Sequence, residues 1–518
     1  MSGRYVEVSR RAGAVIGGIL VYILIWFSLV LLIAGLGIRF FWGKISVGQM
    51  LLNLVSVQTD GGGGAIVWMG IFGIGVLPVL ITIGIAVFRH LRLRKLRKNG
   101  LEHTKRRKPW IRRSISTVLV VALTVGGGSA FATTVGMGDY IKSASSKYDM
   151  NDYYAEPQIT DDSKKNNVVT IYLESGEETL TDESLFEKNA FSSLQNSTQE
   201  SEGWKSVDNF QQYEGGGWTM AGLTSTQCGV PLKGPGIIGS GSSIGESEGT
   251  QDNYLGGLNC AGNVLADHGY KSEFLGGANG SFASKDKFLS SHGFDEEKDL
   301  NTWRSMGEDA KNFRSDWGLS DERLMAHARD EIDRLHAESE QTGQPFNLSM
   351  LTLDTHEPVH MYDYCKQDTD SDVTSVYACS MDQVAGYVDY MKEKGYLDDT
   401  AVVIQGDHLK HMKSSDSFHK QLDKNNNRSI FNRVWVPGED NQRRLRPGID
   451  QLNMYPTMLE AAGLEVKDHQ AGLGVSAFTD TIPDDSAQSL DPDDYKELLT
   501  TDSKDFYTKA WAGEHVRS

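Results

Sequence analysis

The stretch NVVTIYLES, residues 167–175, sets the class of fold. After Asn167, six apolar or β-branched residues follow without a charge, which is typical of a strand buried on both faces of a parallel sheet. Glu174 and Ser175 come directly after this strand. Because open α/β sheets bind ligands at the carboxyl ends of their strands, Glu174 is a candidate metal ligand. Taken alone, it could equally be an acid at the start of a helix.

Strands and helices alternate through the rest of residues 166–478. Short apolar runs predict the strands, and segments of 10–17 residues with a helical pattern predict the helices between them. This alternation indicates βαβ units, and therefore an α/β fold with a mostly parallel sheet flanked by helices. The predicted strands are Tyr270–Leu275, Phe346–Leu353 and Thr400–Gln405, and the predicted helices are Cys260–Gly269, Arg323–Ser339, Ser380–Lys394 and Asn453–Gly463.

Two of the later strands also end in polar residues. His356 follows one of them, and the pair Asp407-His408 follows another. Since the ends of parallel strands meet at one edge of a sheet, we expect these residues to converge on Glu174. Each has an ordinary alternative: an Asp-His pair after a strand is often a turn, and His356 could be a half-buried imidazole whose hydrogen bonds are satisfied.

A glycine-rich stretch, GGGWTMAGLTSTQCGVP at 215–231, adds a hydroxyl group. Thr219 stands after a flexible turn at the start of a predicted helix, where backbone N–H groups can stabilise an anion. The ordinary interpretation is a turn followed by a Thr N-cap. Two carboxylates, one imidazole and this hydroxyl make a four-ligand site for a divalent cation, which would lower the pKa of the Thr219 hydroxyl and make it a nucleophile.

Residues 1–137 are predicted to form a membrane domain. Three runs carry no charged side chain and are long enough to cross a bilayer, which takes about 20 apolar residues. A cleaved signal peptide is not expected, because the first run is too long and further spans follow. The three runs are Ala12–Ile38, Ala65–Phe88 and the glycine-rich Ser114–Met137.

The loop at 89–113 contains twelve Lys and Arg residues and lies between the second and third runs. The positive-inside rule places this loop in the cytoplasm, where anionic lipid headgroups would attract it. Arg4, Arg10 and Arg11 place the N-terminus on the same side. Three crossings then leave everything after about residue 138 outside the cytoplasm.

Charge divides the chain in the same way. Residues 1–150 hold 19 Lys and Arg against 5 Asp and Glu, whereas the remainder holds 32 against 64. An external part this acidic would repel phosphate backbones, so nucleic acid is not an expected partner. The sequence has no internal repeat, no GxGxxG after a strand and no GxxxxGK[ST] motif, so neither a dinucleotide fold nor a P-loop is predicted.

All four cysteines lie in the predicted external part. An even number in an oxidising compartment predicts two disulfides, although three connectivities are possible. We prefer the pairs of sequence neighbours, and the absence of CxxC spacing disfavours a metal site. The preferred pairs are Cys228–Cys260 and Cys365–Cys379.

Two further segments flank the predicted catalytic domain at 166–478. Residues 138–165 are polar and without a regular pattern, and we interpret them as a juxtamembrane linker. Residues 479–518 are acidic, with DDS, DPDD and TDSKD, and we interpret them as a peripheral segment or a tail.

Five motifs together resemble the sulfatase/alkaline-phosphatase superfamily: NVVTIYLES, GWTMAGLTSTQCGVPL, LDTHEP, GDH and NMYPTMLEAAG. Within it, the likeness points to the membrane phosphoglycerol transferases, both the lipoteichoic acid synthases and the enzymes that modify periplasmic glucans. It covers roughly residues 165–478 and implies a sulfatase-like α/β domain in the bacterial cell membrane. The resemblance extends to the paired cysteines at QCG and NCAGNVL, which supports the first disulfide.

The resemblance assigns roles to individual residues. Thr219 would be the nucleophile, because it lies ten residues before Gly229, as the sulfatase nucleophile does before its glycine; Thr224 and Thr226 are poorer candidates. His356 matches the family's substrate-phosphate histidine. The residues that match the family's metal ligands are Glu174, Thr219, Asp407 and His408.

Four more residues are candidates for the substrate pocket. Lys285 falls where lipoteichoic acid synthases carry an arginine near the glycerophosphate and where the glucan enzyme carries lysine. Trp218 also matches the glucan enzyme, since the lipoteichoic type has lysine there; both departures leave the acceptor open. Arg314 and Trp317, in FRSDWGLSDE, have a surface arginine and a packed tryptophan as their ordinary interpretations.

The resemblance implies phosphatidylglycerol as donor and an envelope glycan or glycerophosphate polymer as acceptor, through a covalent glycerophospho-threonine, with membrane lipids as further partners. The two carboxylates and the mixed nitrogen and oxygen ligands of the predicted metal site favour Mn²⁺, with Mg²⁺ or Zn²⁺ as alternatives. The same site would also suit a phosphoethanolamine transferase, a phosphodiesterase or a sulfatase, although sulfatases normally carry Cys or Ser in a CxPSR-like string. A catalytically dead envelope scaffold or sensor is the alternative from another class.

Overall fold

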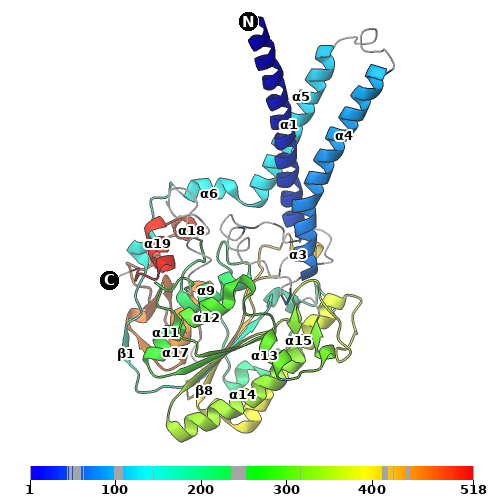
Figure 1. Cartoon of the computed structure of the whole chain (residues 1–518). Helices are drawn as coiled ribbons and strands as arrows, with labels where there is room; N and C mark the ends of the chain where they lie inside the picture. The colour runs from blue at the N-terminus through cyan, green and yellow to red at the C-terminus, as the bar shows by residue number, and fades with distance from the viewer. Residues whose placement is uncertain are drawn as a thin grey trace. The chain divides into compact units, whose positions relative to one another are not determined.

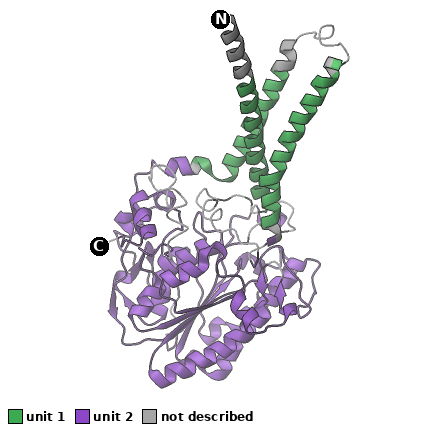
Figure 2. Cartoon of the chain, in the orientation of Figure 1, with its two compact units in different colours: residues 1–47, 65–138 green, residues 48–64, 139–518 purple. Residues whose placement is uncertain are grey.

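The computed structural model divides the chain into two compact units (Figure 2). The first comprises residues 1–47 and 65–138, and the second comprises residues 48–64 and 139–518. The structure describes all residues except 1, 42, 44, 46–49, 51–59, 62–63, 99–108, 144, 235–252, 315–316, 411–417, 424, 439–443 and 517–518.

Long apolar helices make up the first unit. Their apolar side chains are largely exposed, with Phe88 67% and Leu119 64% accessible, and a surface of this kind is stable only when lipid or protein covers it. Three segments are long and apolar enough to cross a membrane, close to the three predicted runs: Val15–Phe41, Val67–Lys95 and Ser114–Thr134. The helices are α1 (Ser2–Phe41), α3 (Gly64–Gly70), η1 (Ile71–Val76), α4 (Leu77–Lys98) and α5 (Pro109–Thr134).

Glycines allow α1 and α5 to pack closely against each other. A Cβ atom on Gly127 would lie 2.5 Å from the Ser28 carbonyl oxygen, so a larger residue would push the helices apart. Ser28 Oγ donates to Thr124 Oγ1 at 3.0 Å across the same contact. The GGG run at 126–128 therefore does not break α5, because small residues there serve helix packing in an apolar medium.

A six-stranded sheet organises the second unit, in the order β4-β3-β7-β2-β8-β9. Its strand β8 is labelled in Figure 1. The first five strands are parallel, and β9 runs antiparallel to β8 at one edge. The predicted α/β fold with a mostly parallel sheet is confirmed. The strands are β4 (Glu296–Lys298), β3 (Lys271–Gly276), β7 (Phe346–Leu351), β2 (Asn167–Leu173), β8 (Thr400–Gly406) and β9 (Asn432–Trp435).

Alternate residues of the central strand β2 face two helical layers, as the period of a strand requires. Val169 and Ile171 pack in the hydrophobic cluster with α14 (Asp321–Thr342) and α15 (Asp372–Lys394). Val168 packs in the opposite cluster with α11 (Ala261–Asp267) and α17 (Met454–Ala461). Full burial of each such side chain contributes about 1.5–3 kcal/mol, so both layers hold the sheet in place.

The segments flanking the predicted catalytic domain are folded onto it. In residues 138–165, Met150 and Tyr154 are completely buried, and β1 (Ile159–Asp161) pairs with β10 (Glu465–Val466). The acidic segment 479–518 forms α18 (Pro492–Thr500) and α19 (Lys504–Ala512), whose Phe506 and Trp511 pack in the same cluster as Tyr154.

Candidate active site

Neighbouring strands carry the predicted metal ligands to one place. The register pairs Leu173, at the end of β2, with Gly406, at the end of β8, so the residues that follow the two strands are adjacent. One ligand atom from each of Glu174, Asp407 and His408 lies within 4.8 Å of the other two, and all three side chains are buried. Parallel pairing thus produces the expected convergence.

Local hydrogen bonds fix the orientation of these side chains. Asp407 Oδ1 accepts from the backbone N–H groups of Ser175 and His408, each at 2.8 Å. Glu174 Oε1 accepts from Ser175 Oγ at 2.7 Å. The other oxygen of Asp407, Oδ2, is buried and has no hydrogen-bond partner among the residues that the structure describes.

The imidazole of His408 faces both carboxylates through Nε2. Its Nδ1 donates to the Leu409 carbonyl oxygen at 2.8 Å, and a carbonyl can only accept, so Nε2 keeps its lone pair in the neutral ring. Nε2 lies 3.5 Å from Asp407 Oδ2 and 3.7 Å from Glu174 Oε1. This is the tautomer that a histidine ligand needs.

Burial and like charge act together on the carboxylates. Burial, and then the charge of Asp407, raise the pKa of Glu174 above its ordinary value. Burial lowers the pKa of His408, but the carboxylates of Asp407 and Glu174 outweigh it, so that the pKa is raised overall. Two buried carboxylates are unfavourable unless a positive charge lies between them. The donor set and the unpartnered Asp407 oxygen therefore fit a divalent cation.

Thr219 is the first residue of α9 (Thr219–Cys228), with the extended Trp218 as its N-cap. Its Oγ1 donates to Glu174 Oε2 at 3.3 Å, so the hydroxyl is directed at the carboxylates and does not cap the helix. The helix packs directly on the Asp407 loop, because a Cβ on Gly222 would lie 2.1 Å from the Asp407 carbonyl oxygen. Trp218 is half-buried against the cluster that contains Met220.

His356 comes together with two of the pocket candidates. Its ring centroid lies 3.8 Å from that of Trp317, and Arg314 Nη1 donates to its carbonyl oxygen at 2.8 Å. Nδ1 donates to the Glu357 carbonyl oxygen at 2.8 Å, which leaves Nε2 for the site. Burial lowers the pKa of His356, and the charge of Glu174 opposes this effect. Arg314 is 5% exposed and therefore not a surface arginine.

Lys285 is connected to Trp317 and His356 through Phe282, which lies three residues earlier in the chain. It begins α12 (Lys285–Ser291), is 5% exposed, and places Nζ 5.7 Å from the centre of the Phe274 ring. Phe282, three residues earlier, packs edge-on against Trp317 with a centroid distance of 5.5 Å. The chain thus links Lys285 to Trp317, whereas no direct contact between Lys285 and the carboxylates is recorded in the described part of the chain.

Sequence reasoning missed a set of charged residues behind the site. Lys410 Nζ donates to Glu357 Oε1 at 2.6 Å and so joins the loops that carry His356 and His408. Arg428 donates to both oxygens of Glu177, at 2.8 and 2.7 Å. The available signal was position, because Glu177, Glu357 and Lys410 each follow a strand end within a few residues. Arg428 is distant in sequence and carried no such signal.

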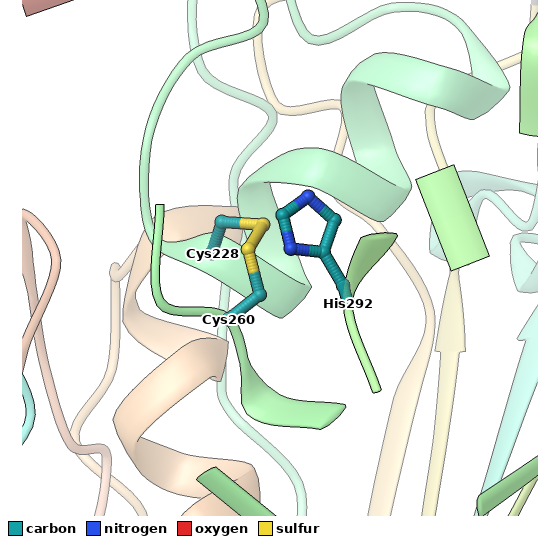
Figure 3. A group of neighbouring side chains, drawn as sticks. All are labelled: Cys228, Cys260 and His292. Atoms are coloured by element: carbon teal, nitrogen blue, oxygen red, sulfur yellow. A yellow bond between two sulfur atoms is a disulfide. The ribbon is translucent and has the colours of Figure 1, made fainter. Parts of the chain in front are cut away.

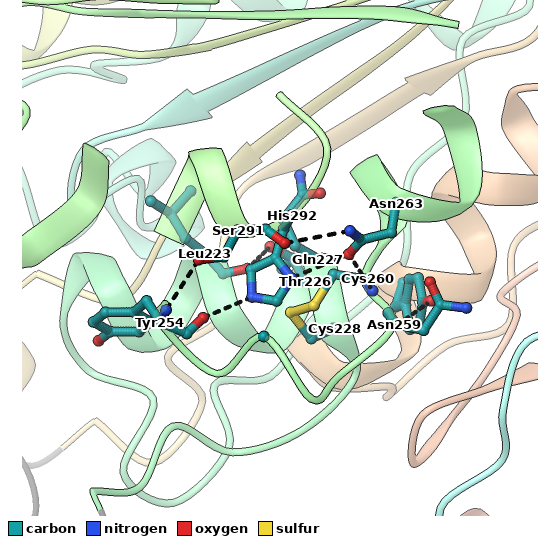
Figure 4. The surroundings of a disulfide bond; sticks show 12 residues. Leu223, Thr226, Gln227, Cys228, Tyr254, Asn259, Cys260, Asn263, Ser291 and His292 are labelled. Carbon is teal, nitrogen blue, oxygen red and sulfur yellow. Dashed lines mark hydrogen bonds between the residues drawn. A yellow bond between two sulfur atoms is a disulfide. The ribbon is translucent and has the colours of Figure 1, made fainter. Parts of the chain in front are cut away.

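Two disulfides use all four cysteines, in the preferred pairing: Cys228–Cys260 and Cys365–Cys379. The first ties the C-terminal end of α9 to the start of α11, and the imidazole of His292 lies beside it (Figure 3). The ring nitrogens of His292 contact the Tyr254 carbonyl oxygen and Asn263 Oδ1, at 2.9 and 3.1 Å (Figure 4). Because both sulfurs are bonded to each other, this trio offers no thiolate for a metal.

Comparison with known proteins agrees with this architecture. The sulfatase family model matches residues 166–464. Phosphoglycerol transferase I of Xanthomonas campestris pv. campestris (strain B100) is 32% identical over 366 residues, which cover 68% of this chain and 48% of that protein. Phosphoglycerol transferase I of Escherichia coli O139:H28 (strain E24377A / ETEC) is 29% identical over 377 residues, covering 70% and 46%. The chain therefore spans about half the length of these two relatives.

Among solved structures, a protein in the alkaline phosphatase superfamily from Vibrio parahaemolyticus has the same fold. Its TM-score is 0.52 at 18% identity, and the match covers 74% of this chain and 96% of that one. The family match extends over more than half of the chain and includes the strands that carry the buried carboxylates. This protein belongs to the sulfatase family.

Proposed function

We propose that the chain transfers glycerophosphate from phosphatidylglycerol to a hydroxyl group of an envelope glycan or glycerophosphate polymer. The observation that carries the proposal is the buried cluster of Glu174, Asp407 and His408, to which the Thr219 hydroxyl is joined by its hydrogen bond to Glu174. The names of the two relatives, phosphoglycerol transferase I, favour this phosphoryl group over others. The apolar helices of the first unit favour a donor that resides in the membrane.

Thr219 is the nucleophile in this scheme. An alcohol attacks slowly at neutral pH unless its environment favours loss of the proton. Thr219 Oγ1 already donates to Glu174, and it stands at the N-terminus of α9, where backbone N–H groups favour negative charge. Both features favour loss of the Thr219 proton, and the resulting alkoxide would attack the phosphorus atom of the donor.

Glu174, Asp407, His408 and Thr219 would hold the cation, and their mixed oxygen and nitrogen donors suit Mn²⁺, with Mg²⁺ and Zn²⁺ as alternatives. Such an ion would lower the pKa of the Thr219 hydroxyl and offset the charge of the phosphate oxygens.

Two half-reactions then exchange one alcohol for another at phosphorus. Thr219 Oγ forms a bond to phosphorus while the bond to the diacylglycerol oxygen breaks. In this scheme His356 enters as the imidazolium, with a proton on each ring nitrogen, and the proton on Nε2 passes to that oxygen, which leaves the ring neutral. The proton of Thr219 passes to the Glu174 carboxylate that accepts it. In the second half-reaction an acceptor hydroxyl attacks phosphorus, its proton goes to His356, and Thr219 leaves with its own proton restored.

The pocket candidates would bind the glycerophosphate in this scheme. The Lys285 ammonium would meet the negative phosphate oxygens, and Arg314 holds the His356 backbone in place. Trp317 packs against the His356 ring and limits its rotation. Trp218, next to the nucleophile, would contact the acceptor, which we take to be a glycan since aromatic rings pack well on sugar faces.

The test compares two threonines of α9. Thr219→Val should abolish diacylglycerol release from phosphatidylglycerol vesicles, and the glycerophosphate adduct on the peptide containing Thr219 should disappear from its mass spectrum. Thr224→Val is the matched control, because Thr224 Oγ1 is buried without a hydrogen-bond partner among the described residues. Removing such a hydroxyl leaves stability nearly unchanged or higher.

Full activity of Thr219→Val would overturn the scheme. Release of free glycerophosphate in the presence of glycan, with no glycan product, would identify a phosphodiesterase that uses the same nucleophile.

A further inference from the structure

A short piece of the connection between the first two apolar helices belongs to the catalytic unit. Residues 48–64 group with residues 139–518, and Asp60 and Gly61 of this piece make hydrogen bonds to the rest of that unit. They contact the loop 277–284, which follows β3, and the helix α13 (Leu300–Ser305). We call this contact the loop clamp.

Three donor groups form the loop clamp: the Arg304 guanidinium, the Asn279 backbone N–H and the Asn279 side-chain amide. Arg304 binds the Asp60 carboxylate through both terminal nitrogens, with Nη1 to Oδ2 at 2.8 Å and Nη2 to Oδ1 at 3.0 Å. The Asn279 backbone N–H donates to the Gly61 carbonyl oxygen at 3.2 Å, and Asn279 Nδ2 donates to the Asp60 carbonyl oxygen at 3.4 Å. A bidentate Arg–carboxylate pair fixes direction as well as distance.

Gly61 fits this contact for two reasons. Its φ is +68°, in the left-handed region that favours glycine. A Cβ at this position would lie 2.3 Å from Leu300 Cδ2 and 3.0 Å from Asn279 Cβ. The backbone therefore approaches α13 and the loop more closely than any other residue would allow. The exposed ion pair alone would add little, so the clamp depends on the combination.

The clamped loop is the one that leads to the pocket candidates. Phe282 lies three residues after Asn279 and packs on Trp317, which in turn packs on His356. Lys285 follows directly after the loop. Because Gly280 N–H is also held by Asp299, at the start of α13, the loop and this helix move together. A displacement at Asn279 would reach both Phe282 and Lys285.

We propose that Asp60 and Gly61 are positioning residues for the substrate pocket: they hold the loop 277–284 so that Phe282 stays packed on Trp317 and Lys285 faces the phosphate of a phospholipid donor. This inference rests on the proposed function, since it takes Lys285 to bind the donor. It implies that the connection between the first two apolar helices contributes to the pocket, and not only to anchoring.

The experiment uses the full chain in nanodiscs that contain phosphatidylglycerol. The variants are Asp60→Arg, Arg304→Asp and the double reversal, which restores the pair with opposite polarity. Asp505→Arg is the matched control, since Asp505 is an exposed acid paired with Lys509 at 3.1 Å and distant in sequence from the clamp. Hydrogen–deuterium exchange of the Asn279 amide and the steady-state kinetics of diacylglycerol release are measured for each.

Each single reversal should speed exchange of the Asn279 amide and raise KM for phosphatidylglycerol by about three- to tenfold. The double reversal should return both quantities to within about twofold of the wild-type values, because the effects of two directly contacting charges are coupled. Asp505→Arg should change neither quantity. The exchange measurement does not depend on activity, so it tests the clamp even if the proposed reaction is wrong.

Wild-type exchange at Asn279 in both single variants would overturn the clamp. Faster exchange with an unchanged KM would overturn its role in the pocket. Absence of diacylglycerol release from the wild-type protein would instead contradict the proposed function.

Discussion

Glu174 and Asp407 hold two carboxylates in a buried space, which is a costly arrangement in a protein without a cation. The neighbouring residues hold the two carboxylates close together. Ser175 donates hydrogen bonds to both, and His408 Nε2 lies 3.5 Å from Asp407 Oδ2 and 3.7 Å from Glu174 Oε1. Asp407 Oδ2 accepts no hydrogen bond from the residues that the structure describes, and this is the clearest sign that the arrangement serves binding and not stability.

Metal binding should therefore appear as stabilisation. In the EDTA-treated full chain, Mn²⁺ at 100 times its Kd should stabilise the fold by about 2.7 kcal/mol, seen as a rise in Tm. Asp407→Asn should lose most of this rise, because the amide offers no charge to the ion. The matched control is Asp450→Asn, since Asp450 is also a buried acid but bonds to Tyr495. An equal rise in both variants would contradict the assigned ligands.

At this scale the sequence identifies residues that follow a strand or open a helix. Glu174, Asp407 and His408 were predictable because the ends of parallel strands meet. Arg428, the partner of Glu177, was not predictable, since it is distant in sequence and gains its role only through a tertiary contact. Lys410 follows a strand end, but that position alone does not indicate its pairing with Glu357. Whether the residues brought together act as assigned is the question that the variants address.

Among the elements, α9 carries the nucleophile candidate and is fixed at both ends. At its N-terminus Thr219 bonds to Glu174, and at its C-terminus Cys228 is joined to Cys260. Between them, Gly222 lies against the Asp407 carbonyl oxygen. The distance between helix and sheet edge is therefore set by a residue without a side chain.

Gly222→Ala should move α9 away from the sheet. Its Cβ would lie 2.1 Å from the Asp407 carbonyl oxygen, and overpacking of this kind costs about 1–3 kcal/mol. We expect lower stability in urea unfolding and a large loss of activity, because Thr219 moves with the helix. Gly386→Ala in α15 is the matched control: there a Cβ meets only the end of the Arg329 side chain, Nη2 at 3.1 Å, which donates to the Gly386 carbonyl oxygen.

For Gly386→Ala we expect unchanged or slightly higher stability, since alanine favours a helix by about 0.5–1 kcal/mol over glycine. Wild-type activity of Gly222→Ala would mean that the position of α9 does not control the nucleophile.

Elements with a strong pattern were predictable and others were not. The buried strands at β2 and β8 begin where predicted and end there or one residue later, because each is a continuous apolar run. The helix α15 begins eight residues before its predicted start, since Asp372–Cys379 is rich in Thr, Ser and Val and weakens the helical pattern. The helices α18 and α19 lie in an acidic segment whose buried Phe506 and Trp511 are too sparse to form a run.

Across the whole molecule, charge and cysteines separate the same two parts. The basic residues of the first unit concentrate at 89–113, whereas both disulfides lie in the acidic second unit. Disulfides persist in oxidising compartments, and basic loops remain in the cytoplasm. The loop clamp adds an independent constraint: Asp60, between the first two apolar helices, must be on the same side of the membrane as Arg304.

These constraints together predict how the chain lies in the membrane, and single cysteines can test it. All four native cysteines are in disulfides, so an introduced cysteine is the only free thiol. Asp505→Cys, at a site whose side chain is 67% exposed, should react with a membrane-impermeant maleimide on intact spheroplasts. Lys95→Cys, at the exposed end of α4, should react only after the membrane is permeabilised. Equal labelling of both on intact spheroplasts would place the basic loop on the outer side together with the catalytic unit and would contradict the predicted orientation of the chain.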